Sequence, residues 1–477
     1  MRKLLYIFPP LFCCLSARTQ NEQKMFWALN GSASGFVWDA TAANNRIDNG
    51  NGTWNTTGTN KTWTFNKGLT DVAWRPSAAA IFGGNPGTGA AGTVTVSGTQ
   101  TAQSLTFNPA ASLTFTLSGG TITNTSGNIT ANANASIGSV LAGSSGLTLA
   151  GTSTIILTSI STFTGTTTIN SGTLQLSNGV ANATTATLST PIVIASGGTL
   201  SADILTANVN LSGNISGAGT LALANTTPQA QTMRLYGSNS GFTGNFSEPS
   251  TARGIMWSDN GGTGNAANTG SAAASWNMSG SFGFIETAAT ATPTVQLGSL
   301  SGTNSATTLG GFSGSGTKTF QIGALNTNTT FAGAIQDNPQ GTGTPVIALI
   351  KVGTGTLTMS GTNTYSGATT VNAGTLAFTT AVPSSTTWNI AVNATSTPTS
   401  ASSGLMTLPA SPSLFGTTVN IVLTGTSTGF TWQAMSWTGS ASPPPILQIN
   451  GTGVTSGVSS GGTTVTFTAN SGITVKR

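Results

Sequence analysis

Residues 351–378 read KVGTGTLTMSGTNTYSGATTVNAGTLAF. Apolar side chains alternate with threonine in short runs, and glycine and asparagine interrupt these runs. Alternation with a period of two is typical of a β-strand that has one apolar face. Glycine allows positive φ at a corner, and asparagine tolerates the same backbone region. The stretch therefore predicts short strands that are joined by tight turns.

The same pattern occurs elsewhere in the chain. Residues 163–176 (FTGTTTINSGTLQL) align without a gap with residues 365–378, and a looser copy lies at 235–244. The Gly-Thr-Leu element also returns at 198–200, 219–221 and 355–357. One such unit cannot bury its own apolar face, whereas stacked units can. The repetition therefore predicts a β-solenoid.

Further alternating runs show how far the solenoid extends. They lie at 93–96, 104–107, 112–117 and 120–123, and we place the solenoid at residues 91–380. With a coil on the order of 20 residues, this span predicts roughly 14 coils. At about 4.8 Å between strands, the coils would form a rod of about 70 Å.

Residues 351–378 resemble the autotransporter-associated β-strand repeat, which recurs in the passenger regions of bacterial autotransporter-like proteins. The resemblance implies a right-handed parallel β-helix, export, and a place in the medium or on the outer-membrane surface. It brings no catalytic residue. The positions that carry the motif are Gly355, Thr356, Leu357, Gly361, Asn363, Tyr365, Gly367, Thr370, Val371, Asn372, Gly374, Thr375 and Leu376.

Residues 1–17 predict a secretory signal peptide. They read MRKLLYIFPPLFCCLSA, in which a basic start precedes an apolar run and small residues. Cys13 and Cys14 are the only cysteines, so a mature chain without this segment would hold no disulfide and no thiolate metal site. No later run is apolar for the roughly 20 residues that a membrane-spanning helix needs.

The two ends of the chain differ from the middle. Residues 18–90 hold half of the 10 tryptophans, and we interpret them as a cap, because an open solenoid end exposes sheet edges and core. A sugar-binding platform is the alternative, since flat rings stack on sugars. Residues 381–477 predict a β-rich module or a second cap. The tryptophans in question are Trp27, Trp38, Trp54, Trp63 and Trp74.

The inventory of reactive side chains argues against catalysis. The chain has no histidine, which excludes a Ser-His-Asp triad and a histidine-based zinc site. Glycosidases need two carboxylates, and the least implausible pair is Glu248 with Asp259; the competing interpretation is solvated turn residues. The net charge is +5 without a basic run, so no nucleic-acid partner is expected. We expect no cofactor and no metal.

Three functions remain open. The first is a non-enzymatic secreted or cell-surface protein that acts in adhesion or as an extracellular scaffold, with a host or matrix polysaccharide or protein as its partner. The second is a β-helix protein that binds or degrades polysaccharide, because this fold also supports enzymes. The third is a structural layer or filament protein.

Overall fold

The computed structural model describes residues 35–477 except 42–45, 58–60, 66–68, 84–88, 113, 178–185, 205–207, 225–231, 250–253, 259–269, 287–291, 341, 384, 386, 396, 400–401, 415, 442–444, 457–458, 461–462 and 469–471. The predicted signal peptide at residues 1–17, together with Trp27 and Asp259, lies outside the described residues.

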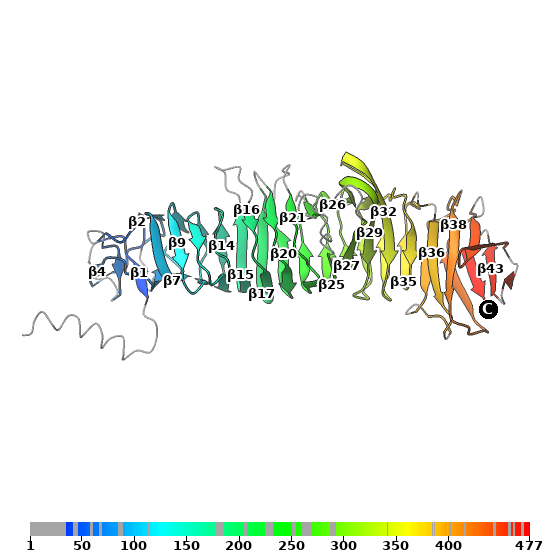
Figure 1. Ribbon diagram of the computed structural model, residues 1–477, viewed down its shortest axis with the longest axis horizontal. Helices are drawn as coiled ribbons and strands as arrows, with labels where there is room; N and C mark the ends of the chain where they lie inside the picture. Colours follow the sequence, from blue (N-terminus) through cyan, green and yellow to red (C-terminus); the bar gives the residue numbers. More distant parts are fainter. Residues whose placement is uncertain are drawn as a thin grey trace, which may run out of the picture.

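The molecule is a long stack of short β-strands (Figure 1). The described residues contain no helix, and from β6 (Thr93–Val96) onward most strands pair in parallel with the strand one coil further along the chain. The predicted all-β solenoid is therefore confirmed. None of the described residues forms a helix that is long and apolar enough to cross a membrane.

Most strands predicted from alternation are present with nearly the expected bounds. The runs at 104–107, 112–117 and 120–123 correspond to β7 (Thr99–Phe107), β8 (Phe115–Ser118) and β9 (Thr121–Asn124). Later in the chain, the structure contains β36 (Thr387–Asn393), β38 (Thr418–Thr424) and β40 (Ile446–Ile449). The period of two was therefore a sufficient guide to the strands, because each has one face toward the core.

The strands of the described residues form three sheets, and the largest has 29 strands. A seven-stranded sheet, here called sheet B, consists of β16 (Ala186–Leu188), β18 (Val209–Leu211), β21 (Met233–Leu235), β24 (Gly254–Ser258), β26 (Phe282–Glu286), β28 (Thr308–Gly311) and β31 (Ala334–Gln336). An eight-stranded sheet consists of β30 (Thr329–Phe331), β33 (Thr356–Met359), β35 (Gly374–Phe378), β37 (Gly404–Thr407), β39 (Thr431–Ser436), β44 (Gly472–Lys476), β43 (Thr463–Thr468) and β42 (Ser459–Ser460).

One apolar core runs along the stack, because inward residues lie directly over one another. In one column Val94 pairs with Leu117, Leu117 with Ile137, and Ile137 with Leu157. All four are buried. Burying one such side chain stabilises the fold by about 1.5–3 kcal/mol, so each coil depends on its neighbours for most of its stability.

The coils are not uniform in length. Between β10 (Asn128–Ala131) and β13 (Leu147–Gly151), Ile129 faces Leu149, so the sequence separation is 149 − 129 = 20. Between β36 and β38, Asn389 faces Asn420, and the separation is 420 − 389 = 31. The predicted coil of about 20 residues is right for some coils and too short for others, which insert extra residues between strands.

Parallel pairing continues across the boundaries expected at residues 90 and 380. At the first boundary, β2 (Gly52–Trp54) pairs in parallel with β6. At the second, β35 pairs in parallel with β37. The sheets are thus continuous at both positions.

Antiparallel pairs occur, among the described strands, only toward the two ends. At the N-terminal end, β1 (Phe36–Trp38) pairs with β3 (Trp63–Thr64), which pairs with β4 (Asp71–Val72). At the C-terminal end, β40 pairs with β41 (Thr452–Val454), and β44 joins β39 to β43. A strand that reverses direction does not continue the parallel stacking, so the regular stacking ends at these strands.

Candidate functional site

The two copies of the repeat motif have the same stacking geometry. In one, Leu147 of β13 faces Thr167 of β15 (Thr167–Ser177). In the other, Leu349 of β32 (Thr342–Lys351) faces Thr369 of β34 (Thr369–Val371). The two sequence separations are equal, since 167 − 147 and 369 − 349 both give 20. A copy therefore contains one coil and the strand on which that coil stacks.

The glycines of the motif lie where neighbouring coils touch. A Cβ on Gly355, Gly361 or Gly367 would collide with a backbone carbonyl oxygen of the preceding coil. Gly374 has a φ of +68°, and its Cβ would lie 2.5 Å from the carbonyl oxygens of Gly353 and Gly355. Any larger residue would push the coils apart, so these positions need glycine for packing.

The remaining motif positions follow the alternation of the strands. Leu357, Val371 and Leu376 are buried in the core. The threonines at 356, 370 and 375 are half-buried, and Asn372 is exposed. The N–H of Asn372 donates to the carbonyl oxygen of Lys351 at 2.9 Å. These residues build the coil and offer no reactive group.

Asn363 and Tyr365 fix the corner between two strands. Asn363 is buried; its Nδ2 donates to the carbonyl oxygen of Gly361 at 2.9 Å, and its Oδ1 accepts from the N–H of Ile335 at 2.9 Å. The hydroxyl of Tyr365 lies 2.8 Å from Oγ1 of Thr369, and burial raises its pKa above the usual range. Both side chains hold the corner in place.

Lys351 points inward, although its type predicts exposure. Its Nζ donates to the carbonyl oxygens of Val352 and Gly353, both at 2.7 Å, and of Ala373 at 3.2 Å. Three acceptors use all three N–H groups of an ammonium. Burial lowers the pKa of Lys351 to about 8. The lysine therefore serves as an internal brace for a corner of the repeat.

Glu248 is not a solvated turn residue, as its type suggested, but a buried one. Its side chain is 3% exposed, and its Oε1 accepts from the N–H of Gly280 at 2.8 Å. Its Oε2 has no hydrogen-bond partner among the described residues. Burial raises the pKa of Glu248 to about 8, so the group is mostly protonated at neutral pH. The carboxyl is therefore enclosed by the fold and bonded to the backbone of the next coil.

Other acids also serve the fold. Asp203 accepts from Oγ of Ser177 at 3.2 Å and from Nε2 of Gln175 at 3.4 Å. Asp337 accepts from the N–H groups of Ile347 at 2.7 Å and Ser366 at 3.1 Å. In the part of the chain that the structure describes, no three acidic or thiol side chains gather where they could hold a metal ion.

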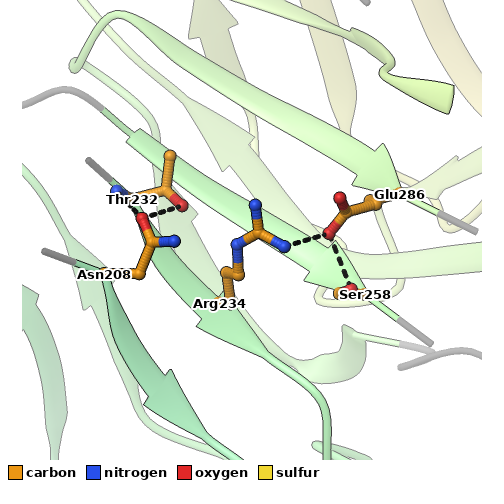
Figure 2. A network of polar contacts seen from close by, with 5 residues as sticks. All are labelled: Asn208, Thr232, Arg234, Ser258 and Glu286. Carbon is orange, nitrogen blue, oxygen red and sulfur yellow. Dashed lines mark hydrogen bonds and ion pairs between the residues drawn. The ribbon is translucent and has the colours of Figure 1, made fainter. Parts of the chain in front are cut away.

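Sheet B carries a partly exposed charged pair. Nη1 of Arg234 on β21 lies 2.9 Å from Oε2 of Glu286 on β26, and Oγ of Ser258 donates to the same oxygen at 2.8 Å. Figure 2 shows the guanidinium pointing toward Glu286, and β24 lies between their two strands. A partly exposed pair is worth at most about 1 kcal/mol. The contacts link β21, β24 and β26 of three successive coils, and Arg234 neutralises the charge of Glu286.

Four tryptophans of the N-terminal region pack into its core. Trp38, Trp54 and Trp63 have no exposed surface, and Trp74 is 3% exposed. The ring centroids of Trp38 and Trp63 are 5.3 Å apart, and those of Trp54 and Trp74 are 4.9 Å apart. These four rings therefore present no flat face to a sugar and instead fill the end of the stack.

A hollow of about 530 Å³ lies beside this tryptophan cluster. Three consecutive coils line it, through Asn49–Asn51, Ala90–Thr93 and Thr114. Oδ1 of Asn51 accepts from the N–H of Thr93 at 2.7 Å. None of the described residues that line this hollow, which we call the cap hollow, is charged. Sequence patterns gave no sign of it, because its residues are ordinary turn and strand residues.

The comparisons with known proteins identify the repeat. The family model of the Passenger-associated-transport-repeat matches residues 147–176 and 349–378. No curated protein and no solved structure matches the chain. The motifs at 163–176 and 365–378 are the C-terminal halves of the two matched segments, and the looser copy at 235–244 lies outside both.

The molecule is thus a β-solenoid with passenger-type repeats. More particularly, it carries two copies of the Passenger-associated-transport-repeat, which confirms the resemblance to autotransporter passenger repeats. This repeat implies an extracellular or cell-surface location.

Proposed function

We propose that this chain forms the exported, non-enzymatic rod of a bacterial surface protein that attaches cells to a matrix or host surface. The observation that carries the proposal is the placement of both passenger repeats, in the same register, within one continuous solenoid. Such a rod holds its end at a distance from its point of attachment. A signal peptide at residues 1–17 and association with the outer membrane are parts of the same proposal.

A non-enzymatic role is supported by the chemistry of the described acids. Glu248 is enclosed, Glu286 is paired with Arg234, and Asp337 holds two backbone N–H groups. Histidine is absent from the chain, so acid–base work would depend on carboxylates, lysines or tyrosines. These three carboxylates already have structural tasks.

The antiparallel strands favour discrete rods over a filament or layer. A filament that continues the parallel stacking from one rod to the next would need a free parallel strand at each end. The strands β3, β4 and β41 run antiparallel toward these ends instead. Polysaccharide binding, without degradation, is the second candidate function, and the cap hollow is the observation that favours it.

Protease treatment of intact producing cells tests export and surface display. We expect long, protease-resistant fragments to be released, because stacked coils protect their backbone. Protection of the whole chain inside the cell would contradict the proposal. Loss of surface attachment on deletion of the gene, restored by the gene in trans, tests adhesion. Release of reducing ends from matrix polysaccharides by the purified chain would contradict the non-enzymatic role.

A further inference from the structure

The cap hollow is a built feature, because the core of the cap fixes its walls. Nε1 of Trp38 donates to the carbonyl oxygen of Gly50 at 3.2 Å. Oδ1 of the buried Asp39 accepts from the N–H of Asp48 at 3.1 Å. Two adjacent residues, Trp38 and Asp39, thus hold both sides of Asn49. The wall that carries the asparagines is therefore set before any ligand arrives, which lowers the entropy cost of binding.

The wall of the hollow contains a buried polar atom that the described residues leave without a partner. Asn49 is 6% exposed, and its Nδ2 donates to the carbonyl oxygen of Gly89 at 3.1 Å. This bond orients the carboxamide and leaves Oδ1 without a hydrogen bond. A buried acceptor without a partner costs about 1–3 kcal/mol. Because this oxygen is enclosed, Asn49 shapes the wall of the hollow, and the side chains within reach of a ligand are those of Asn51, Thr93 and Thr114.

The lining also selects the class of ligand. Side-chain amides, the exposed hydroxyls of Thr93 and Thr114, and backbone groups surround the hollow. A basic side chain would favour a phosphate or carboxylate ligand, and none of the described lining residues is basic. A protein partner would need a large apolar centre, and the tryptophan rings beside the hollow are buried. Neutral, hydroxyl-rich molecules of modest size fit both the lining and the volume.

We propose that the cap hollow binds a neutral glycan, with Asn51, Thr93 and Thr114 as its polar contacts. The proposal rests on the proposed adhesive function and places the contact at the N-terminal end of the rod. It differs from stacking on tryptophan, because the tryptophan rings are buried and Trp38 supports the lining through its hydrogen bond to Gly50. Binding would depend on hydroxyl-to-amide hydrogen bonds and would be weak for one rod and strong for many rods on one cell.

The test uses the purified full chain and immobilised dextran, mannan and cellulose, with polygalacturonate as a charged comparison. Thr93→Arg fills the hollow with a large side chain, while the backbone N–H that bonds Asn51 remains. Thr95→Arg is the matched control: it lies on the same face of the same strand, is likewise exposed, and is outside the lining. We expect at least one neutral polysaccharide to bind, at least a tenfold loss with Thr93→Arg, and no loss with Thr95→Arg.

Several results would overturn the proposal. They are equal binding by Thr93→Arg and the unchanged chain, binding to polygalacturonate alone, and the absence of binding to every neutral polysaccharide. Thr114→Trp provides a second block from another coil, and circular dichroism verifies that each variant is folded. Attachment of intact cells is measured separately. If cells that carry Thr93→Arg still attach as well as the unchanged strain, the hollow is excluded as the site of attachment, while the adhesive function of the rod stands.

Discussion

The two repeats, residues 147–176 and 349–378, share one backbone plan but satisfy it with different side chains. Phe163 in the first is Tyr365 in the second, and both are buried. Leu149 in the first is Lys351 in the second, and both point into the stack. The stacking steps between coils are the same in both. The repeat therefore fixes the direction of each side chain and the contacts between coils. It is less strict about whether a buried side chain is polar or apolar.

The second repeat accommodates polar groups through local partners. Lys351 bonds three corner carbonyl oxygens, and Tyr365 bonds Thr369. In the first repeat, Thr167 occupies the position of Thr369 and bonds Thr190 instead. A buried polar group is tolerated when its hydrogen bonds are satisfied, and it costs stability when they are not. The two repeats thus show that some buried positions accept a polar side chain, provided that it fills the space and its hydrogen bonds are satisfied.

Removal of the corner aromatic should have the largest effect. Tyr365→Ala leaves a cavity between coils and is expected to cost about 3–5 kcal/mol, and Phe163→Ala should be similar. Because a solenoid does not unfold as one unit, the measurement is the local free energy of opening from hydrogen exchange over each repeat. A cost under about 1 kcal/mol in either copy would show that the aromatic does not fill a shared core position.

Gly374 should be the next most sensitive position. Gly374→Ala adds a Cβ that is 2.5 Å from two carbonyl oxygens at a φ of +68°, and we expect a loss of about 2–3 kcal/mol. Gly416→Ala is the matched control, since Gly416 has a φ of +70° with nothing within 4 Å of its Cβ. The control should lose only about 1 kcal/mol of backbone strain. Equal losses in hydrogen exchange would contradict the close contact between coils.

The sequence was sufficient to predict the strands and the stacking but not the corners. Alternation and the recurrence of the motif identify inward positions such as Val371 and Leu376 directly. The inward direction of Lys351 also follows from alternation, but one of its three carbonyl partners, Ala373, belongs to the next coil. Glu248 and the cap hollow depend on which turns lie side by side after stacking. Insertions within coils, such as the one between β2 and β6, hide these turns because they have no regular period.

The pH response of the second repeat should depend on Lys351. The pKa of Lys351 is about 8 when folded and 10.5 for a free lysine, so between these values the unfolded chain binds more protons. Stability of residues 349–378 should therefore rise by about 2 kcal/mol as the pH increases from 8 to 10.5. Lys351→Leu, which copies the first repeat, should abolish the rise. The stability of the repeat at each pH is measured by urea unfolding and by hydrogen exchange over residues 349–378. If the rise persists in Lys351→Leu, a group other than Lys351 causes it.

The smallest effect is expected from making the corner aromatics alike. Tyr365→Phe removes one buried hydrogen bond to Thr369 and should cost about 1 kcal/mol. The reverse change, Phe163→Tyr, adds a hydroxyl next to Thr167, which already bonds Thr190. Hydrogen exchange of the two corners compares them. A loss above about 3 kcal/mol for Tyr365→Phe would mean that the hydroxyl, more than the ring, holds the corner.

The most direct test of the account is the register within the repeats, measured by disulfide formation in a chain that has no cysteine beyond position 14. Thr148 faces Thr168 in the first repeat, and Ile350 faces Thr370 in the second. Cysteine pairs at 148 and 168, and at 350 and 370, should oxidise rapidly and without loss of structure, because parallel neighbours lie within disulfide reach. A pair at 148 and 170, which is out of register, should not. Faster oxidation of the offset pair would contradict the stacked parallel solenoid.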